Sequence, residues 1–99
     1  MTDEAPRQFE IEVPPEVVPG SYADFANVWH TPDVFVMDFV SLARPPQSAT
    51  DAEGNPITVV PGRVVQCVRI PPHQVFELAK ALTQQLEFWE QETGRSTNS

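Results

Sequence analysis

The sequence predicts an α+β fold, in which an antiparallel sheet of three or four strands carries one long C-terminal helix packed on one face. Two observations predict this fold. Between residues 8 and 70, several segments alternate apolar with polar side chains, which is the period of half-buried strands. After Pro72, apolar residues recur every three or four positions, as they do on the buried face of a helix. Ninety-nine residues hold one domain of this kind.

The strands are expected in the alternating segments. These are residues 8–13, 21–30, 34–42 and 63–70, with a short further run at 57–60. Thr31-Pro32-Asp33 has turn chemistry, because proline fixes φ and aspartate can bond its own backbone. The segments on either side of this turn should therefore form an antiparallel hairpin. The second of them is apolar on both faces, which predicts a central strand covered by the helix on one side and by a partner subunit on the other.

The helix is expected to begin at Pro72, because proline suits the first helical position, and to end at Gly94, which can take the left-handed capping conformation. Its apolar stripe consists of Val75, Leu78, Ala79, Leu82, Leu86 and Trp89. Phe76 and Phe88 lie off this stripe, and leaving each exposed would forgo about 2 kcal/mol of burial. Phe88 is therefore a candidate contact between subunits, with wrapping by a loop as the alternative.

Polar segments divide the chain into tails, a loop and one domain. Residues 1–7 and 95–99 are expected to be disordered tails, residues 8–94 a single domain, and residues 44–56 a mobile loop without periodicity. About 75 residues then remain to build a core, which is few for a stable domain. We therefore expect a homodimer or a dimer of dimers, with Val36 and Val40 as candidate interface residues beside Phe88.

Charge, cysteine content and hydropathy indicate which partners and which cellular location to expect. Fourteen acidic residues against six basic ones give a formal charge of −8, and the cations are scattered. This charge repels phosphates, so neither nucleic acid nor a membrane surface is an expected partner. The one cysteine cannot form an internal disulfide. With no basic, apolar leader and no apolar run of about 18 residues, the expected location is the cytoplasm.

The most distinctive string surrounds the predicted turn. Trp29, His30, Pro32 and Asp33 place a large aromatic, a titratable ring and a rigid turn within five positions. Tryptophan is enriched at interface hot spots, so this tip is a candidate interaction site. The alternative is that Trp29 belongs to the core and Pro32 only sets the turn.

No residue is assigned a catalytic, cofactor-binding or metal-binding role, and no cofactor is expected. Cys67 lies in an apolar run and is interpreted as a small core residue. Asp38 interrupts a β-patterned run, where it would need a partner such as Arg69. A pocket gathering His30, Asp24 and Asp38 would favour an enzyme or metal-binding protein instead.

Two blocks of sequence carry a family resemblance. Residues 22–39 form the first, and Arg69-Ile70-Pro71-Pro72-His73-Gln74 leading into the helix forms the second. Together they resemble a family of short prokaryotic proteins known as domain of unknown function 3467, over about residues 20–92. Pro71 stands where that family has a serine or threonine, so no side-chain helix cap is expected. The resemblance implies no activity.

The expected function is a small cytoplasmic homo-oligomeric protein-interaction module without catalytic activity. Its first expected partner is a second copy of itself, and another protein is a further candidate. The order of strands followed by a long helix is also similar to that of SecB-type export chaperone subunits, a likeness of topology alone. One alternative is therefore a SecB-like holdase that binds unfolded chains on exposed aromatic surface. The other is a small enzyme or metal-binding protein using His30 and nearby carboxylates.

Overall fold

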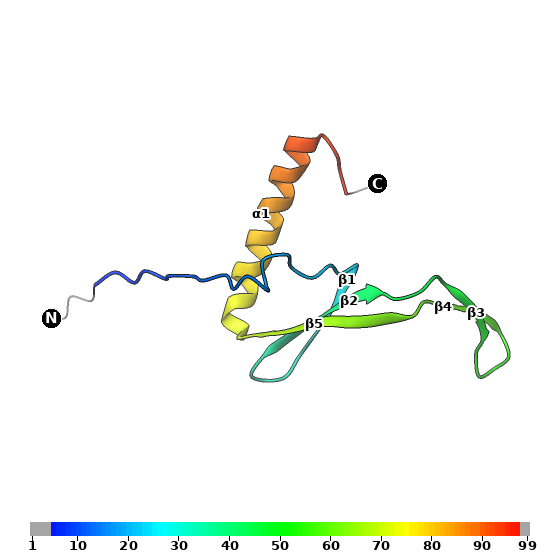
Figure 1. The fold of residues 1–99 in the computed structure, drawn as a ribbon. Helices are drawn as coiled ribbons and strands as arrows, with labels where there is room; N and C mark the ends of the chain where they lie inside the picture. Colours follow the sequence, from blue (N-terminus) through cyan, green and yellow to red (C-terminus); the bar gives the residue numbers. More distant parts are fainter. Residues whose placement is uncertain (1–4, 98–99) are drawn as a thin grey trace.

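The computed structural model of the chain describes residues 5–97. Its elements in chain order are β1 (Phe25–His30), β2 (Phe35–Leu42), β3 (Gln47–Thr50), β4 (Pro56–Val59), β5 (Gly62–Ile70), the 3-10 turn η1 (Pro72–Gln74) and α1 (Val75–Thr93) (Figure 1). One antiparallel sheet has the strand order β1-β2-β5, and β3 and β4 form a second, two-stranded sheet. The α+β fold class is confirmed.

The hairpin at the predicted turn is present, and β2 is the central strand. His30 pairs with Phe35 at the turn, where the Thr31 N–H donates to the Val34 carbonyl at 2.9 Å. The Thr31 hydroxyl oxygen also accepts the Val34 N–H at 3.3 Å. At the far end, the Asp24 carboxylate accepts the Leu42 N–H at 2.7 Å. At this end of β1 the Asp24 side chain accepts the hydrogen bond in place of a backbone carbonyl. The strand therefore begins at Phe25 and is shorter than the predicted strand over 21–30.

Two other segments differ from the sequence expectation. Residues 8–13 form no strand and are exposed, and a turn follows in which the Val17 N–H donates to the Pro14 carbonyl at 2.9 Å. Residues 44–56, expected as a loop, contain β3 and the start of β4, which pair antiparallel. Asp51 closes this hairpin because its Oδ1 accepts the N–H groups of Glu53 and Asn55 at 2.9 and 2.8 Å. The expected tails lie partly outside the described residues.

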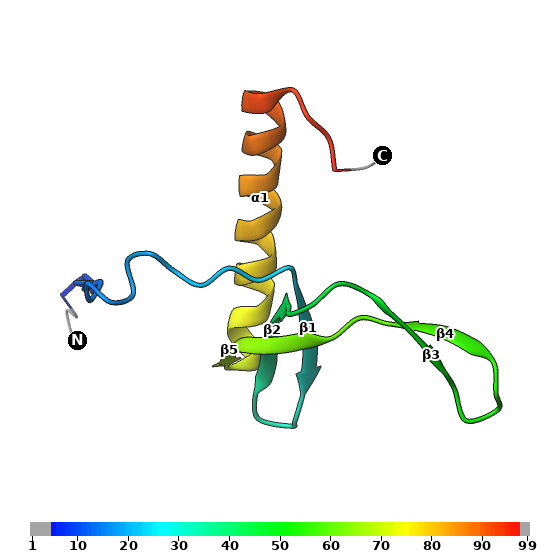
Figure 2. The ribbon, with the colours of Figure 1, turned by 45° about the vertical axis from the view of Figure 1, so that its right-hand side comes forward.

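The helix has its predicted ends but not its predicted place. Gly94 takes the left-handed conformation (φ 70°), its N–H donates to the Glu90 carbonyl, and no side chain caps the N-terminus. The expected packing of the helix over one face of the sheet is not made within the chain, because α1 rises away from the sheet (Figures 1 and 2). The physical reason is the connection. Pro71 leaves β5 in extended conformation (ψ 149°), and η1 passes directly into α1, so the helix continues outward from the end of the strand.

As a result, the single chain buries very little. Among the described residues the buried apolar core consists of Val36, fully buried, and Val40, at 7% exposure. The radius of gyration is 19.6 Å, against about 13 Å for a compact chain of 100 residues. The accessible surface is 9027 Å², whereas a compact protein of this mass exposes about 5,700 Å². The excess of about 3,300 Å² is surface that a globular chain would have covered.

Val36 should dominate the stability of the sheet. Val36→Ala removes two methyl groups from a fully buried site and should cost about 2 kcal/mol of unfolding free energy. Val28 lies on β1 and is 62% exposed, so Val28→Ala is the matched control, with an expected change within about 0.5 kcal/mol. Urea denaturation followed by circular dichroism measures both. Equal costs for the two variants would contradict this core.

Gly62 is required by close packing. A Cβ at this position would lie 2.8 Å from Cγ1 of the buried Val40. Gly62→Ala should therefore cost about 1–3 kcal/mol through overpacking. Adding Val40→Ala removes the opposing methyl group, so the double variant should be destabilised by less than the sum of the two single variants. Additive costs, measured by the same denaturation, would show that this contact is not responsible.

Candidate functional site

Trp29, Asp38 and Cys67 form a hydrogen-bonded cluster on one face of the three-stranded sheet. Cys67 on β5 lies directly across from Asp38 on β2. From β1, the Trp29 indole N–H donates to Asp38 Oδ2 at 2.9 Å. Trp29 is 46% exposed, so it is not a core residue, and part of its surface stays accessible. The indole is held against β2 by the carboxylate.

This cluster fixes the charge of its two titratable groups. The hydrogen bond from Trp29, followed by that from the Cys67 thiol, lowers the pKa of Asp38, and the charge of Arg69 acts in the same direction. The hydrogen bond to the Asp38 carboxylate, followed by desolvation, raises the pKa of Cys67. At neutral pH the pair is therefore a carboxylate and a protonated thiol. Such a thiol is a weak nucleophile, and such a carboxylate is a poor general acid.

The residues of the alternative enzyme site do not come together. His30 and Asp38 lie on opposite faces of the sheet, because side chains alternate along the β1–β2 ladder. His30 stacks on Phe35 with ring centroids 5.2 Å apart. Asp24 lies just beyond the other end of β1, about 20 Å from His30 along the strand. In the part of the chain that the structure describes, no group of three or more His, Cys, Asp or Glu side chains is placed to hold a metal ion.

The remaining candidate residues fall into three environments. Pro32 and Asp33 are exposed at the tip of the hairpin. Val36 and Val40, candidates for a subunit interface, are covered within the single chain. Phe88 on α1 is exposed, and so is Cys67, which had been interpreted as a core residue. The candidate positions that a partner could reach are therefore the hairpin tip, with Trp29 beside it, and the helix.

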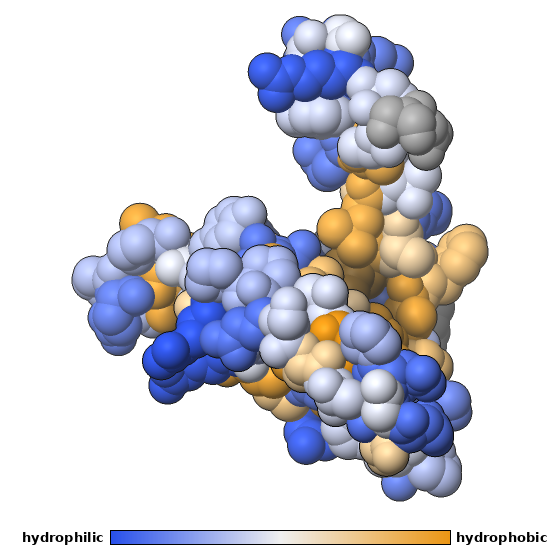
Figure 3. All heavy atoms as spheres, turned by 90° about the vertical axis from the view of Figure 1, so that its right-hand side faces the viewer, coloured by the Kyte–Doolittle hydropathy of each residue, from blue (hydrophilic) through white to orange (hydrophobic). Residues whose placement is uncertain are grey.

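A long uncovered apolar surface lies on α1. We call the α1 stripe the row of Val75, Ala79, Leu82, Leu86 and Trp89 along this helix. Leu78, the sixth residue of the predicted stripe, borders this row and is 36% exposed. Leu82 is 63% exposed, and Phe76 beside the stripe is 70% exposed. Figure 3 shows hydrophobic side chains along the helix and in the angle where it meets the sheet. The sequence predicted this surface as one covered by the chain's own sheet.

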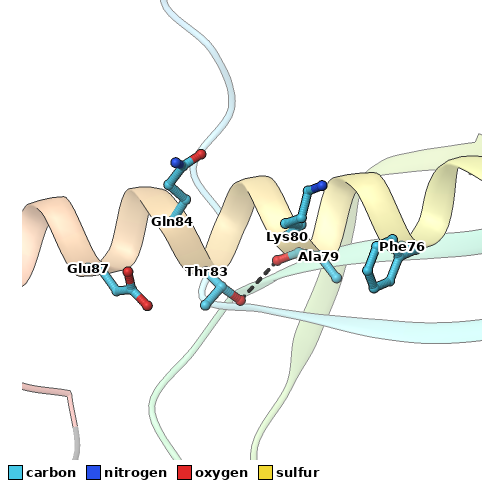
Figure 4. Close-up of a pocket in the computed structure, with 6 residues that line it drawn as sticks. All are labelled: Phe76, Ala79, Lys80, Thr83, Gln84 and Glu87. Carbon is cyan, nitrogen blue, oxygen red and sulfur yellow. Dashed lines mark hydrogen bonds between the residues drawn. The ribbon is translucent and has the colours of Figure 1, made fainter.

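A shallow hollow in the surface of α1 borders the stripe. It is lined by Phe76, Ala79, Lys80, Thr83, Gln84 and Glu87 (Figure 4). The Lys80 ammonium lies 5.7 Å from the centre of the Phe76 ring and 3.8 Å from Glu77, so the lysine leans toward the start of the helix. The Thr83 hydroxyl donates to the Ala79 carbonyl at 2.9 Å. Lys80 and Thr83 thus have partners within the helix, and Phe76 and Ala79 form the apolar part of the lining.

The spacing of the stripe is a further feature of the sequence. Its residues are spaced by alternating steps of four and three, which continue to Thr93. This spacing is typical of helices that pair with helices. The run covers fewer than three heptads, which is short for a coiled coil.

A family model described as "Protein of unknown function (DUF3467)" matches residues 1–95 of the chain. No curated protein and no solved structure matches it. Among the described residues, no helix combines the length and the apolar character needed to cross a membrane.

The raised pKa of Cys67 can be tested by alkylation. The rate of reaction with iodoacetamide should reach half its maximum above pH 9.0, the ordinary pKa of the thiol, because only the thiolate reacts. Asp38→Asn removes the negative charge that opposes ionisation, so the profile should shift to lower pH. Asp33→Asn, at the exposed hairpin tip, is the control and should leave the profile unchanged. A profile that is identical in all three proteins would show that Asp38 does not act on the thiol.

Proposed function

The chain belongs to the DUF3467 family of proteins of unknown function, and we propose that it is a cytoplasmic, non-catalytic protein-interaction module whose subunits associate through the α1 stripe. The observation that supports this most directly is the helix without a partner. α1 has 19 residues, and most of its apolar stripe is exposed rather than packed on a sheet. Most of the stability of a helix in a protein comes from packing its apolar face, so α1 needs a surface to pack against.

The exposed area is sufficient for a stable dimer. A standard interface covers about 800 Å² on each partner, and the chain exposes about 3,300 Å² more than a compact protein of its mass. Part of this excess belongs to the extended segment before β1 and to the β3–β4 hairpin. The helix remains the longest continuous apolar element among the described residues. We therefore assign the subunit contact to it.

The polar groups favour binding over catalysis. Asp38 is held as an anion and Cys67 as a neutral thiol, while His30 lies on the opposite face of the sheet. Neither acid–base nor nucleophilic chemistry has its partners in place. The formal charge of −8 disfavours nucleic acid as a ligand.

A holdase is the second candidate, and exposed aromatic surface supports it. Phe76, Phe88 and Trp89 are all uncovered on α1, and such surface can bind unfolded chains as well as a second subunit. The two candidates differ in what the purified protein does alone. A self-associating module covers its stripe without any client, whereas a holdase keeps apolar surface accessible.

Self-association through the stripe predicts the mass of at least a dimer, and it predicts that a charge placed in the stripe weakens this dimer. Sedimentation at micromolar concentration should give at least twice the 11.1 kDa of one chain. Leu82→Glu places a charge in the interface and should weaken the dimer by at least about tenfold, or about 1.4 kcal/mol. Gln91→Glu adds the same charge on the opposite side of the helix, outside the hollow, and is the matched control, with the mass of the parent protein.

Two outcomes would contradict this proposal. A monomeric parent protein that suppresses aggregation of an unfolded client would replace it with the holdase. Equal weakening by Leu82→Glu and Gln91→Glu would show that the net charge of the helix, and not the stripe, controls association.

A further inference from the structure

We infer that two copies of the chain pair their α1 helices antiparallel, in a register centred on Gln84, so that Trp89 of each copy packs against Ala79 of the other. This inference rests on the proposed function and specifies the partner and geometry of the same surface. It is carried by the sizes of the stripe residues, the hollow beside Ala79 and the distribution of charge along the helix.

The spacing of the stripe makes a two-helix seam possible. Steps of four, three, four, three and four residues separate its members and the following Thr93, so all lie along one line of the helix. Nineteen residues give a seam about 28 Å long. In antiparallel helices the first residue of such a seam lies across from the last residue of the partner. The register centred on Gln84 therefore places Val75 across from Thr93, Ala79 across from Trp89, and Leu82 across from Leu86.

Side-chain volume favours this arrangement over a parallel one. In the antiparallel seam the smallest residue meets the largest, and the two leucines meet each other, so each layer holds a similar volume. In a parallel seam Trp89 would meet Trp89 and Ala79 would meet Ala79. One layer would then be overpacked and another would contain a void, and both defects are destabilising.

The hollow beside the stripe adjoins Ala79, the residue that this register places across from the partner's Trp89. Ala79 lies between Phe76 and Thr83 along the lining (Figure 4). Lys80 does not cover Ala79, because its ammonium leans over the Phe76 ring. An alanine flanked by larger side chains leaves room for a large knob, and Trp89, 38% exposed in the single chain, is the largest side chain of the stripe.

Charge supports the same direction. The second half of α1 carries Glu87, Glu90 and Glu92 with no cation, whereas the first half carries Glu77 paired with Lys80 at 3.8 Å. A parallel pair would bring two acidic ends together and align two helix dipoles. An antiparallel pair separates the acidic ends and opposes the dipoles, and it places each acidic end beside the end that carries Lys80.

Cysteine cross-linking tests the direction of pairing. In a Cys67→Ser background, Val75→Cys and Thr93→Cys are purified separately and then mixed. The antiparallel register predicts a disulfide after mild oxidation only in the mixture, because residues 75 of the two copies lie about 27 Å apart and so do residues 93. A parallel pair would cross-link each variant to itself. Self-linkage in the single variants would overturn the inference while leaving the proposed function intact.

Size exchange tests whether the partner of the stripe is a helix. Ala79→Trp sets two tryptophans against each other, and Trp89→Ala leaves a void, so each variant alone should dimerise more than about tenfold more weakly than the parent. An equimolar mixture restores one large and one small residue in both layers and should dimerise within about threefold of the parent. If α1 instead docks on the partner's sheet, mixing rescues nothing, and the inference is wrong. A monomeric parent protein would remove the proposed function together with it.

Discussion

The path of the chain from β5 into α1 is the constraint that leaves the helix exposed. In most small α+β domains a helix lies over one face of the sheet. Here Pro71 leaves the sheet in extended conformation, the 3-10 turn follows at once, and the helix points outward. The exposed stripe and part of the large surface follow from this geometry.

The sheet is held together by contacts across its own strands. Val36 and Val40 are the buried apolar residues among those described, and both lie on the central strand β2. Beside them, Asp38 draws the Trp29 indole from one edge strand and the Cys67 thiol from the other toward the central strand. Trp29, a candidate interaction residue in the sequence, therefore also has a structural use, because it helps to tie the three strands together.

Local chemistry was predicted well, and long-range placement was not. The turn at Pro32, the central position of β2 and the Gly94 cap follow from residues close together in the chain, so the sequence was sufficient for them. The position of α1 depends on the backbone path between β5 and the helix, which periodicity does not report. The β3–β4 hairpin was missed because Gln47–Thr50 has no apolar alternation and is closed by the side chain of Asp51. The exposure of Cys67 was not predicted, because the residue lies in an apolar run and its bond to Asp38 joins two strands distant in sequence.

The β3–β4 hairpin has a consequence for the dynamics of the chain. Its two strands of four residues pair only with each other and form a separate sheet. A two-stranded ribbon without a third strand or a covering helix is marginally stable in water. Its amide hydrogens should therefore exchange with solvent through local opening, at a free-energy cost well below that of unfolding the three-stranded sheet. The arm is thus a cooperative unit of its own, which can melt and re-form while the rest of the fold stays intact.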